Sequence, residues 1–312
     1  MKLLCVVSGG DAPGINAVLT QLAQLNGGEL LGAVGGFPGL LAGQVQRWSH
    51  TQLVAWMGRG GSLLPSSREA VLNQADAAQR VQAVLADHQV DGLVVFGGNG
   101  TLRYIPPLLQ AWGIPFIGIP TTIDNDVPGV SPSLGFDSAC NYACQAIDGI
   151  LSTASALGGR LFLLETLGGG NGNIALAVAE AAHAHAVVLP EYDYDDQALA
   201  NRLKQAVARD GYGLLVINEY ARGARTLADE LPERTGTRVR DVRLGHAQRG
   251  ATPSHQDRIL AVRLAQAAYA ALSRRESGIL VTAGNGITRH DGALPDSPVL
   301  PDRALYERIN GL

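Results

Sequence analysis

The fold is decided by the stretch GLVVFGGNGTLRYIPPLLQAWGIPFIGIP, residues 92–120. It begins with an apolar run that ends in two glycines, continues with a helical pattern, and closes with a second apolar run. Apolar runs without polar alternation predict strands buried on both faces, and a helix between two such strands joins them in parallel. The stretch therefore predicts one β-α-β unit of a parallel sheet.

The same plan recurs in both halves of the chain, and it predicts an α/β protein with two similar doubly wound lobes. Each lobe should have three layers, α/β/α, around a mostly parallel sheet. At 312 residues the chain also exceeds the usual size of a single core. The region 219–240 is the most polar and is interpreted as a surface excursion. Further strands are predicted at 2–7, 160–166, 187–191, 214–219 and 242–250, and helices at 15–25, 99–112, 137–156, 174–186 and 254–273.

Composition excludes several classes of protein. Hydrophobic residues make up 46% and charged residues 17%, which is typical of a globular chain. The net charge of -4 provides no broad positive field, so we expect no nucleic-acid partner. No apolar run is long enough to span a membrane, and we expect a cytoplasmic protein with no membrane partner. The three cysteines have no metal-ligand spacing and are interpreted as packing residues.

Many of the 39 glycines follow predicted strands. In open α/β sheets ligands bind at the carboxyl ends of strands, where glycine lets backbone N–H groups approach phosphate oxygens. SGGDAPGIN, residues 8–16, fits a tight turn or a phosphate cradle, with Asp11 as a possible helix cap and Pro13 as a helix-initiating residue. FGGNGT, residues 96–101, repeats the arrangement and favours a nucleotide between the two turns.

Two carboxylates follow the last strand of the opening stretch, in PTTIDNDVPG at 120–129. Residues two apart in an extended segment point to one side, so Asp124 and Asp126 would share a cleft. They could bond the local backbone of a turn. Alternatively, one carboxylate accepts a proton from an attacking hydroxyl while the other orients Mg²⁺ or an arginine.

These motifs, with RLFLLETLGGGNGN at 160–173 and LGHAQRGATPSHQDRILAVRLA at 244–265, resemble the phosphofructokinase family in the same order over nearly the whole chain. The resemblance implies a nucleotide-binding lobe formed by 1–136 and 248–298. It also implies a lobe for the sugar phosphate, formed by 137–247 and 299–312.

The activity implied by the resemblance is transfer of the γ-phosphoryl group of ATP to the 1-hydroxyl of fructose 6-phosphate, a step of glycolysis. Asp124 would be the general base, and Thr122 would hydrogen-bond the transferring group. Asp126 and Asn99 would hold Mg²⁺. Such a reaction asks the protein mainly to position groups and to offset charge.

The resemblance also assigns the binding residues. A homo-oligomer, a dimer of dimers with shared active sites, is implied because two arginines would reach a neighbouring subunit's site. Those two are Arg160 and Arg240. The other residues of the sugar-phosphate site would be Leu167, Gly168, Glu219, His246 and Arg249. The nucleotide would contact Gly10, Phe37, Arg68, Gly98, Asn99, Gly100 and Thr101, with Phe37 where the family often has a tyrosine that can stack on adenine.

Three positions depart from the family pattern. Asn99 replaces an aspartate that helps to coordinate magnesium, and an amide brings no charge. Gly169 replaces an arginine that neutralises the transferring group, and Leu167 replaces a methionine. These changes leave a weakly catalytic regulatory subunit as an alternative function.

The phosphoryl donor and the acceptor are also open. Gly100 favours ATP, whereas Thr121 favours neither ATP nor pyrophosphate, so pyrophosphate stays an alternative donor. Sedoheptulose 7-phosphate stays an alternative acceptor. The cations that bind effectors in regulated members are missing from 16–25 and before the strand at 214–219, so we expect little response to ADP or phosphoenolpyruvate.

Overall fold

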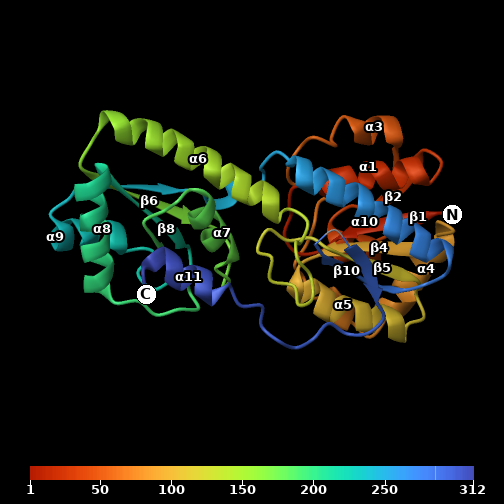
Figure 1. The fold of residues 1–312 in the computed structure, drawn as a ribbon. Helices are drawn as coiled ribbons and strands as arrows, with labels where there is room; N and C mark the ends of the chain where they lie inside the picture. Colours follow the sequence, from red (N-terminus) through yellow and green to blue (C-terminus); the bar gives the residue numbers. More distant parts are fainter. Residues whose placement is uncertain (285) are drawn as a thin grey trace. The chain divides into compact units, whose positions relative to one another are not determined.

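The computed structural model describes residues 1–284 and 286–312, which divide into two compact units (Figure 1). Unit 1 consists of Met1–Ser138 and Arg249–Pro298. Unit 2 consists of Ala139–Gln248 and Val299–Leu312. Both units alternate strands and helices around a sheet that is mostly or wholly parallel, so the predicted α/β class is confirmed.

Unit 1 is built on a seven-stranded sheet with the order β11-β10-β5-β4-β1-β2-β3. The five inner strands run parallel, whereas the edge strands β3 and β11 pair antiparallel with their neighbours. The strands are β1 (Leu3–Val7), β2 (Glu29–Ala33), β3 (Val45–Ser49), β4 (Gly92–Gly97), β5 (Phe116–Pro120), β10 (Gly278–Ala283) and β11 (Gly286–His290).

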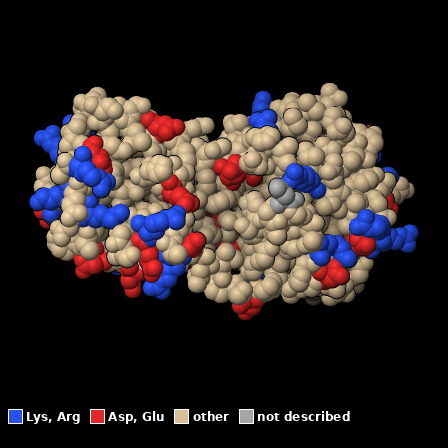
Figure 2. All heavy atoms as spheres, viewed as in Figure 1, with Lys and Arg blue, Asp and Glu red and all other residues tan. Residues whose placement is uncertain are grey.

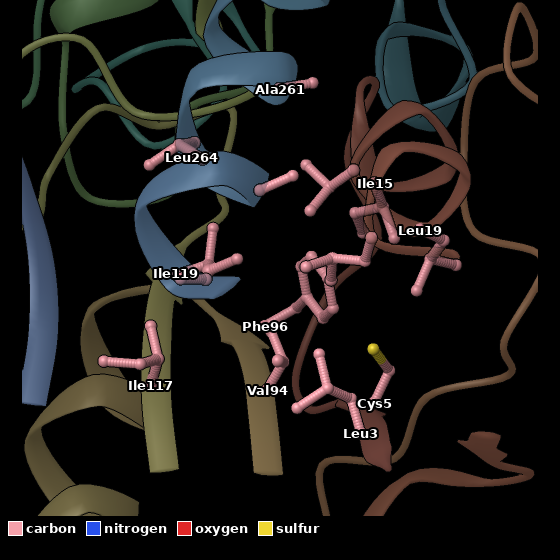
Figure 3. Packing of buried hydrophobic residues seen from close by; sticks show 14 of the residues in the cluster. Leu3, Cys5, Ile15, Leu19, Val94, Phe96, Ile117, Ile119, Ala261 and Leu264 are labelled. Carbon is pink, nitrogen blue, oxygen red and sulfur yellow. The ribbon is translucent and has the colours of Figure 1, made fainter. Parts of the chain in front are cut away.

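Helices cover both faces of this sheet because successive side chains of each central strand point to opposite faces. Leu3 and Cys5 of β1 pack toward α1 (Ile15–Leu25), α3 (His50–Val54) and α10 (His255–Ser273), as Figure 3 shows for much of this cluster. Leu4 and Val6 pack on the opposite face. The elements there are α2 (Gly36–Leu41), η1 (Val71–Asn73), α4 (Ala77–Asp87) and α5 (Asn99–Ala111).

Unit 2 has a four-stranded parallel sheet with the order β7-β8-β6-β9. The long helix α6 (Phe136–Ala156) begins in unit 1 and continues into unit 2. The strands are β6 (Arg160–Thr166), β7 (Ala186–Val188), β8 (Tyr212–Asn218) and β9 (Val239–Arg243). The other helices are α7 (Asn173–Ala181), α8 (Asp196–Asp210), α9 (Leu227–Thr235), η2 (Gly245–Gln248) and α11 (Arg303–Asn310).

The interpretation of 219–240 as a surface excursion is wrong. This region contains α9 and the start of β9, and Leu227 and Leu231 of α9 are buried in the core of unit 2. Ala221 and Ala224 join the same core before the helix begins. The charged side chains of the region flank an apolar stripe at i, i+4 spacing, so its high polarity concealed a packed helix.

The surface charges and the apolar character of the helices complete the description of the fold. Positive and negative side chains are interspersed on the face shown in Figure 2. No helix within 1–284 and 286–312 combines the length and the apolar character that a membrane crossing needs.

Candidate active site

Unit 1 contains a cavity of about 430 Å³ at the carboxyl ends of β1, β4 and β5. These strands are neighbours in the sheet, so the turns that follow them meet at one edge. Eleven residues predicted from the sequence line this unit 1 cavity: Gly10, Phe37, Arg68, Gly98, Asn99, Gly100, Thr101, Thr122, Asp124, Asp126 and Arg249.

The turn after β1 brings two guanidinium groups close to the backbone. A Cβ atom on Gly10 would lie 2.6 Å from Nη1 of Arg249 and 3.5 Å from Nη2 of Arg68. Glycine at this position therefore leaves room for both cations beside a bare backbone. Asp11 is not a helix cap, because α1 begins after Gly14, which adopts a left-handed conformation and makes no side-chain cap bond. Pro13 accordingly precedes the cap instead of starting the helix.

The turn after β4 leads directly into α5. A Cβ atom on Gly97 would lie 2.4 Å from Cβ of Thr101, so only glycine fits between the strand and the first turn of the helix. The N-cap Gly98 makes no side-chain cap bond. The first N–H groups of a 13-residue helix thus have no capping side chain, and the positive end of the helix dipole lies at the cavity.

The two carboxylates reach the same cavity through a turn instead of an extended segment. Asn125 between them has φ +53°, which is left-handed, so the reasoning from period-two alternation is wrong here. Oδ1 of Asn125 accepts the N–H of Ser133 at 2.9 Å, and the Ser133 hydroxyl donates to the carbonyl oxygen of Thr122 at 2.8 Å. This network fixes the turn, and Asp124 and Asp126 both line the cavity.

Asp126 is the possible metal ligand that carries a carboxylate, and it is partly buried. Burial raises the pKa of its carboxyl, although its own backbone, Asn99 and Arg103 oppose that shift. Its Oδ1 is buried and accepts no hydrogen bond from the described residues. A buried oxygen without a partner costs free energy, and a cation would remove that cost.

Asn99 fits a metal less well. Its amide nitrogen faces Oδ2 of Asp126 at 3.5 Å, and its amide oxygen accepts Nε–H of Arg103 at 2.7 Å. Residues 1–284 and 286–312 contain no cluster of three or more His, Cys, Asp or Glu suited to a metal. Mg²⁺ commonly keeps one or two carboxylates and takes its other oxygens from phosphates and water. The residues therefore fit an ion held by Asp126 and by a phosphorylated ligand.

Phe37 offers little of its ring to a ligand. Its side chain is 2% exposed and packs with Leu4, Val6 and Leu40 in the core of unit 1. Phe37 lines the cavity, but so buried a ring has little surface on which an adenine base could stack.

Unit 2 has a cavity of its own, of about 570 Å³, at the carboxyl ends of β6, β8 and β9. Of the residues predicted from the sequence only Glu219 lines this unit 2 cavity, where its Oε1 accepts the N–H of Gly169 at 3.2 Å. Sequence reasoning missed three charged residues in its wall, namely Glu165, Arg225 and Arg243.

The charges in the unit 2 cavity are mixed. Nη1 of Arg243 lies 3.9 Å from Oε2 of Glu165, and its Nε lies 3.4 Å from Oδ2 of Asp241. Burial raises the pKa of Glu165, and the Arg243 charge opposes that shift. Carboxylates accept hydrogen bonds from sugar hydroxyls, and guanidinium groups bind phosphate, so this set suits a phosphorylated polyol.

Five predicted residues line neither cavity. His246 is exposed on η2, and Leu167 is buried with its N–H bonded to Oε1 of Gln248 at 2.7 Å. Gly168 lies beside Asn171 with φ +146°. Arg160 is the first residue of β6 and Arg240 the second of β9, whereas the unit 2 cavity lies at the opposite ends of these strands.

A family model described as phosphofructokinase matches residues 2–272. The chain belongs to the phosphofructokinase family. Among its relatives, an ATP-dependent 6-phosphofructokinase of Coxiella burnetii is 35% identical over 91% of this chain and 89% of its own length. One from Lactobacillus delbrueckii subsp. bulgaricus is 38% identical over 92% and 91%. The family predicted from the sequence motifs is thus confirmed.

A solved structure of the family shares the fold. The pyrophosphate-dependent phosphofructokinase from Marinobacter aquaeolei matches with a TM-score of 0.83 over 99% of this chain and 91% of its own. Its sequence is only 20% identical, so this likeness concerns the fold and leaves the donor open.

Proposed function

We propose that this protein transfers the γ-phosphoryl group of ATP to the 1-hydroxyl of fructose 6-phosphate, giving fructose 1,6-bisphosphate. The observation that carries the proposal is the unit 1 cavity, which gathers two carboxylates, glycine-lined turns and two guanidinium groups. Phosphoryl transfer needs positioned groups and offset charge more than a strong nucleophile, and these residues supply both. The names of relatives at 35% and 38% identity support the same donor and acceptor.

Asp124 is the general base of this proposal. Its carboxylate takes the proton of the 1-hydroxyl while that oxygen forms a bond to the γ-phosphorus. The bond from the γ-phosphorus to the bridging oxygen breaks, and ADP leaves with the electron pair. Thr122 accepts the N–H of Asp124 on its Oγ1 at 3.2 Å, which leaves its hydroxyl hydrogen for the transferring group.

Cations and the start of α5 offset the charge of the donor phosphates. Arg68 and Arg249 converge on Gly10, so their guanidinium groups can bind phosphate oxygens next to the backbone. The resemblance assigned Arg249 to the sugar phosphate. Its guanidinium group, however, lies near Gly10 and Arg68, which favours a role beside the transferring group. Asp126 would hold Mg²⁺, which neutralises phosphate charge when bound.

The unit 2 cavity is the proposed site for groups of the sugar phosphate. Glu219 and Glu165 would accept sugar hydroxyls, and Arg225 and Arg243 would supply positive charge. Arg243 is a candidate to compensate for Gly169, where the family pattern has an arginine.

Arg160 and Arg240 support a shared site in a homo-oligomer, which we propose to be a dimer of dimers. Both arginines lie toward the amino ends of their strands, away from the cavity of their own unit. A strand rises about 3.3 Å per residue, so Arg160 lies roughly 20 Å along β6 from Thr166. Its guanidinium group therefore fits a neighbouring subunit better than its own cavity. We propose the cytoplasm as the site of action, where this donor and acceptor occur together.

The test is steady-state kinetics of Asp124→Asn with ATP, Mg²⁺ and fructose 6-phosphate. We expect kcat to fall by about 10²- to 10⁴-fold, the range for a positioned base, with the Kd of fructose 6-phosphate nearly unchanged. Asp87→Asn, an exposed position at the end of α4, is the matched control and should keep full activity. An unchanged kcat in Asp124→Asn would refute the mechanism.

The remaining alternatives are separated by the choice of substrates in the same assay. Thr121 donates its hydroxyl to the Ile119 carbonyl oxygen at 3.0 Å and brings no cation to the cavity, so this position gives no charge reason for pyrophosphate as the donor. Turnover with pyrophosphate alone would reverse that choice, and turnover with sedoheptulose 7-phosphate alone would change the acceptor. Sugar-phosphate binding without transfer from any donor would identify a regulatory subunit.

A further inference from the structure

The unit 1 cavity has an apolar part next to its phosphate-binding part. Tyr104 and Ile105 lie one helical turn beyond Gly100 and Thr101, and both pairs line the cavity from α5. Residues three and four apart share a face of a helix, so the wall continues from the start of α5 toward Tyr104. Along the facing wall, Arg68 is followed by the cavity-lining residues Glu69, Ala70, Val71 and Leu72.

A hydrogen bond joins these two walls. The hydroxyl of Tyr104 donates to Oδ1 of Asn73, the last residue of η1. Tyr104 is 37% exposed, whereas Phe37, the other aromatic residue in the cavity wall, is 2% exposed. Tyr104 therefore presents the accessible aromatic ring of this cavity, and its bond to Asn73 restricts the orientations of that ring.

We propose that Tyr104, held by Asn73, is the residue against which the base of the nucleotide donor packs, and that it makes the cavity prefer a nucleoside triphosphate to a bare polyphosphate. This inference rests on the proposed function, because it places the donor phosphates at Gly10, Arg68 and the start of α5. An aromatic ring packs on any base through its π face. A ring already held in place loses less conformational freedom on binding.

The inference assigns Tyr104 the role for which the sequence motif indicated Phe37. Phe37 is part of the core, where it packs among leucine and valine side chains. No step of the transfer passes through Tyr104. It is a residue that determines donor specificity, and its removal should change donor affinity more than the chemical step.

The experiment is calorimetric titration with two probes, the non-hydrolysable ATP analogue adenylyl imidodiphosphate and inorganic tripolyphosphate. Tyr104→Ala should raise the Kd of the analogue by roughly 5- to 150-fold, the usual range when a base loses its stacking partner. The Kd of tripolyphosphate should change by less than about twofold, since the phosphate-binding groups stay in place. Gln110→Ala, exposed on the same helix and outside the cavity, is the matched control and should change neither Kd.

Two milder variants test the bond to Asn73. Tyr104→Phe and Asn73→Ala each keep the ring but remove the hydrogen bond. Both should therefore raise the Kd of the analogue by a similar factor, and by less than Tyr104→Ala does. The double variant should raise this Kd no more than either single variant. If Tyr104→Ala, Tyr104→Phe and Asn73→Ala all have Tm values near that of the wild type, the changes in Kd come from the ring and not from a loss of folding.

Several results would overturn the inference. If Tyr104→Ala raised the Kd of both probes equally, Tyr104 would support the cavity as a whole and would not be specific for the base. No change in either probe would exclude a contact with the base, and tighter binding of the analogue would make the ring an obstruction. The titrations need no turnover, so this outcome is separate from that of the Asp124→Asn assay.

Discussion

The two cavities stand in corresponding places, at the carboxyl ends of parallel strands, but they are built from different parts of the chain. In unit 1 the turns are rich in glycine, which lets Thr101, Arg68 and Arg249 approach the backbone closely. In unit 2 the wall carries long charged side chains, among them Glu165 and Arg243. Backbone N–H groups suit phosphates, which every donor shares, whereas side chains suit the hydroxyl pattern of one particular acceptor.

The side-chain character of the unit 2 cavity is tested most directly by Arg243→Gln. Hydrogen bonds to charged groups contribute about 1.5–3 kcal/mol, so KM for fructose 6-phosphate should rise roughly 10- to 150-fold. KM for ATP should stay within about twofold, because the change lies outside the unit 1 cavity. Lys204→Met, exposed on α8, serves as the control for loss of a positive charge. Equal changes in KM for ATP and in KM for fructose 6-phosphate would show that the two cavities do not divide the substrates in this way.

The backbone character of the unit 1 cavity is tested by Gly97→Ala. The added methyl group would lie 2.4 Å from Cβ of Thr101 and would push the first turn of α5 away from β4. Overpacking of this kind costs roughly 1–3 kcal/mol of unfolding free energy, which urea denaturation would measure. KM for ATP should rise while KM for the sugar phosphate changes less. A variant with wild-type stability and ATP affinity would show that this turn needs no glycine.

The smallest expected effect comes from a glycine that lines neither cavity. Gly149 is exposed within α6, and a Cβ atom there would meet nothing within 4 Å. Gly149→Ala should raise the unfolding free energy by about 0.5–1 kcal/mol through helix propensity alone. Both KM values should stay at the wild-type level. A loss of stability at this position would mean that glycine there has a role beyond the helix.

The same contrast explains what the sequence could predict. Three inner strands of unit 1, β1, β4 and β5, were predicted from apolar runs, and β4 ends within one residue of the run 92–98. The inner strands β2 and β10 were not predicted. The edge strand β3 was missed because its side chains are partly or fully exposed and leave no apolar run. Helix α9 was missed because charged residues outnumber its two core leucines, Leu227 and Leu231.

The candidate site divides in the same way. Glycine turns are visible in sequence because their spacing is local, and the unit 1 cavity gathers the turns at Gly10, Gly98 and Gly100. Glu165 and Arg243 are opposite each other only because β6 and β9 pair in a particular register. Strand register depends on the packing of a whole sheet, so the sequence around either residue does not predict that the two are paired.

The turn between the carboxylates has a consequence for how such chains change over time. Asn125 owes its place to a left-handed backbone and to its bond with Ser133, whereas Asp124 and Asp126 face the cavity. A descendant released from catalysis would be free to lose either acid, yet replacing the amide would still disturb the loop. Survival of the middle residue in a diverged copy would therefore report on architecture, whereas survival of its two neighbours would bear on the roles proposed for Asp124 and Asp126.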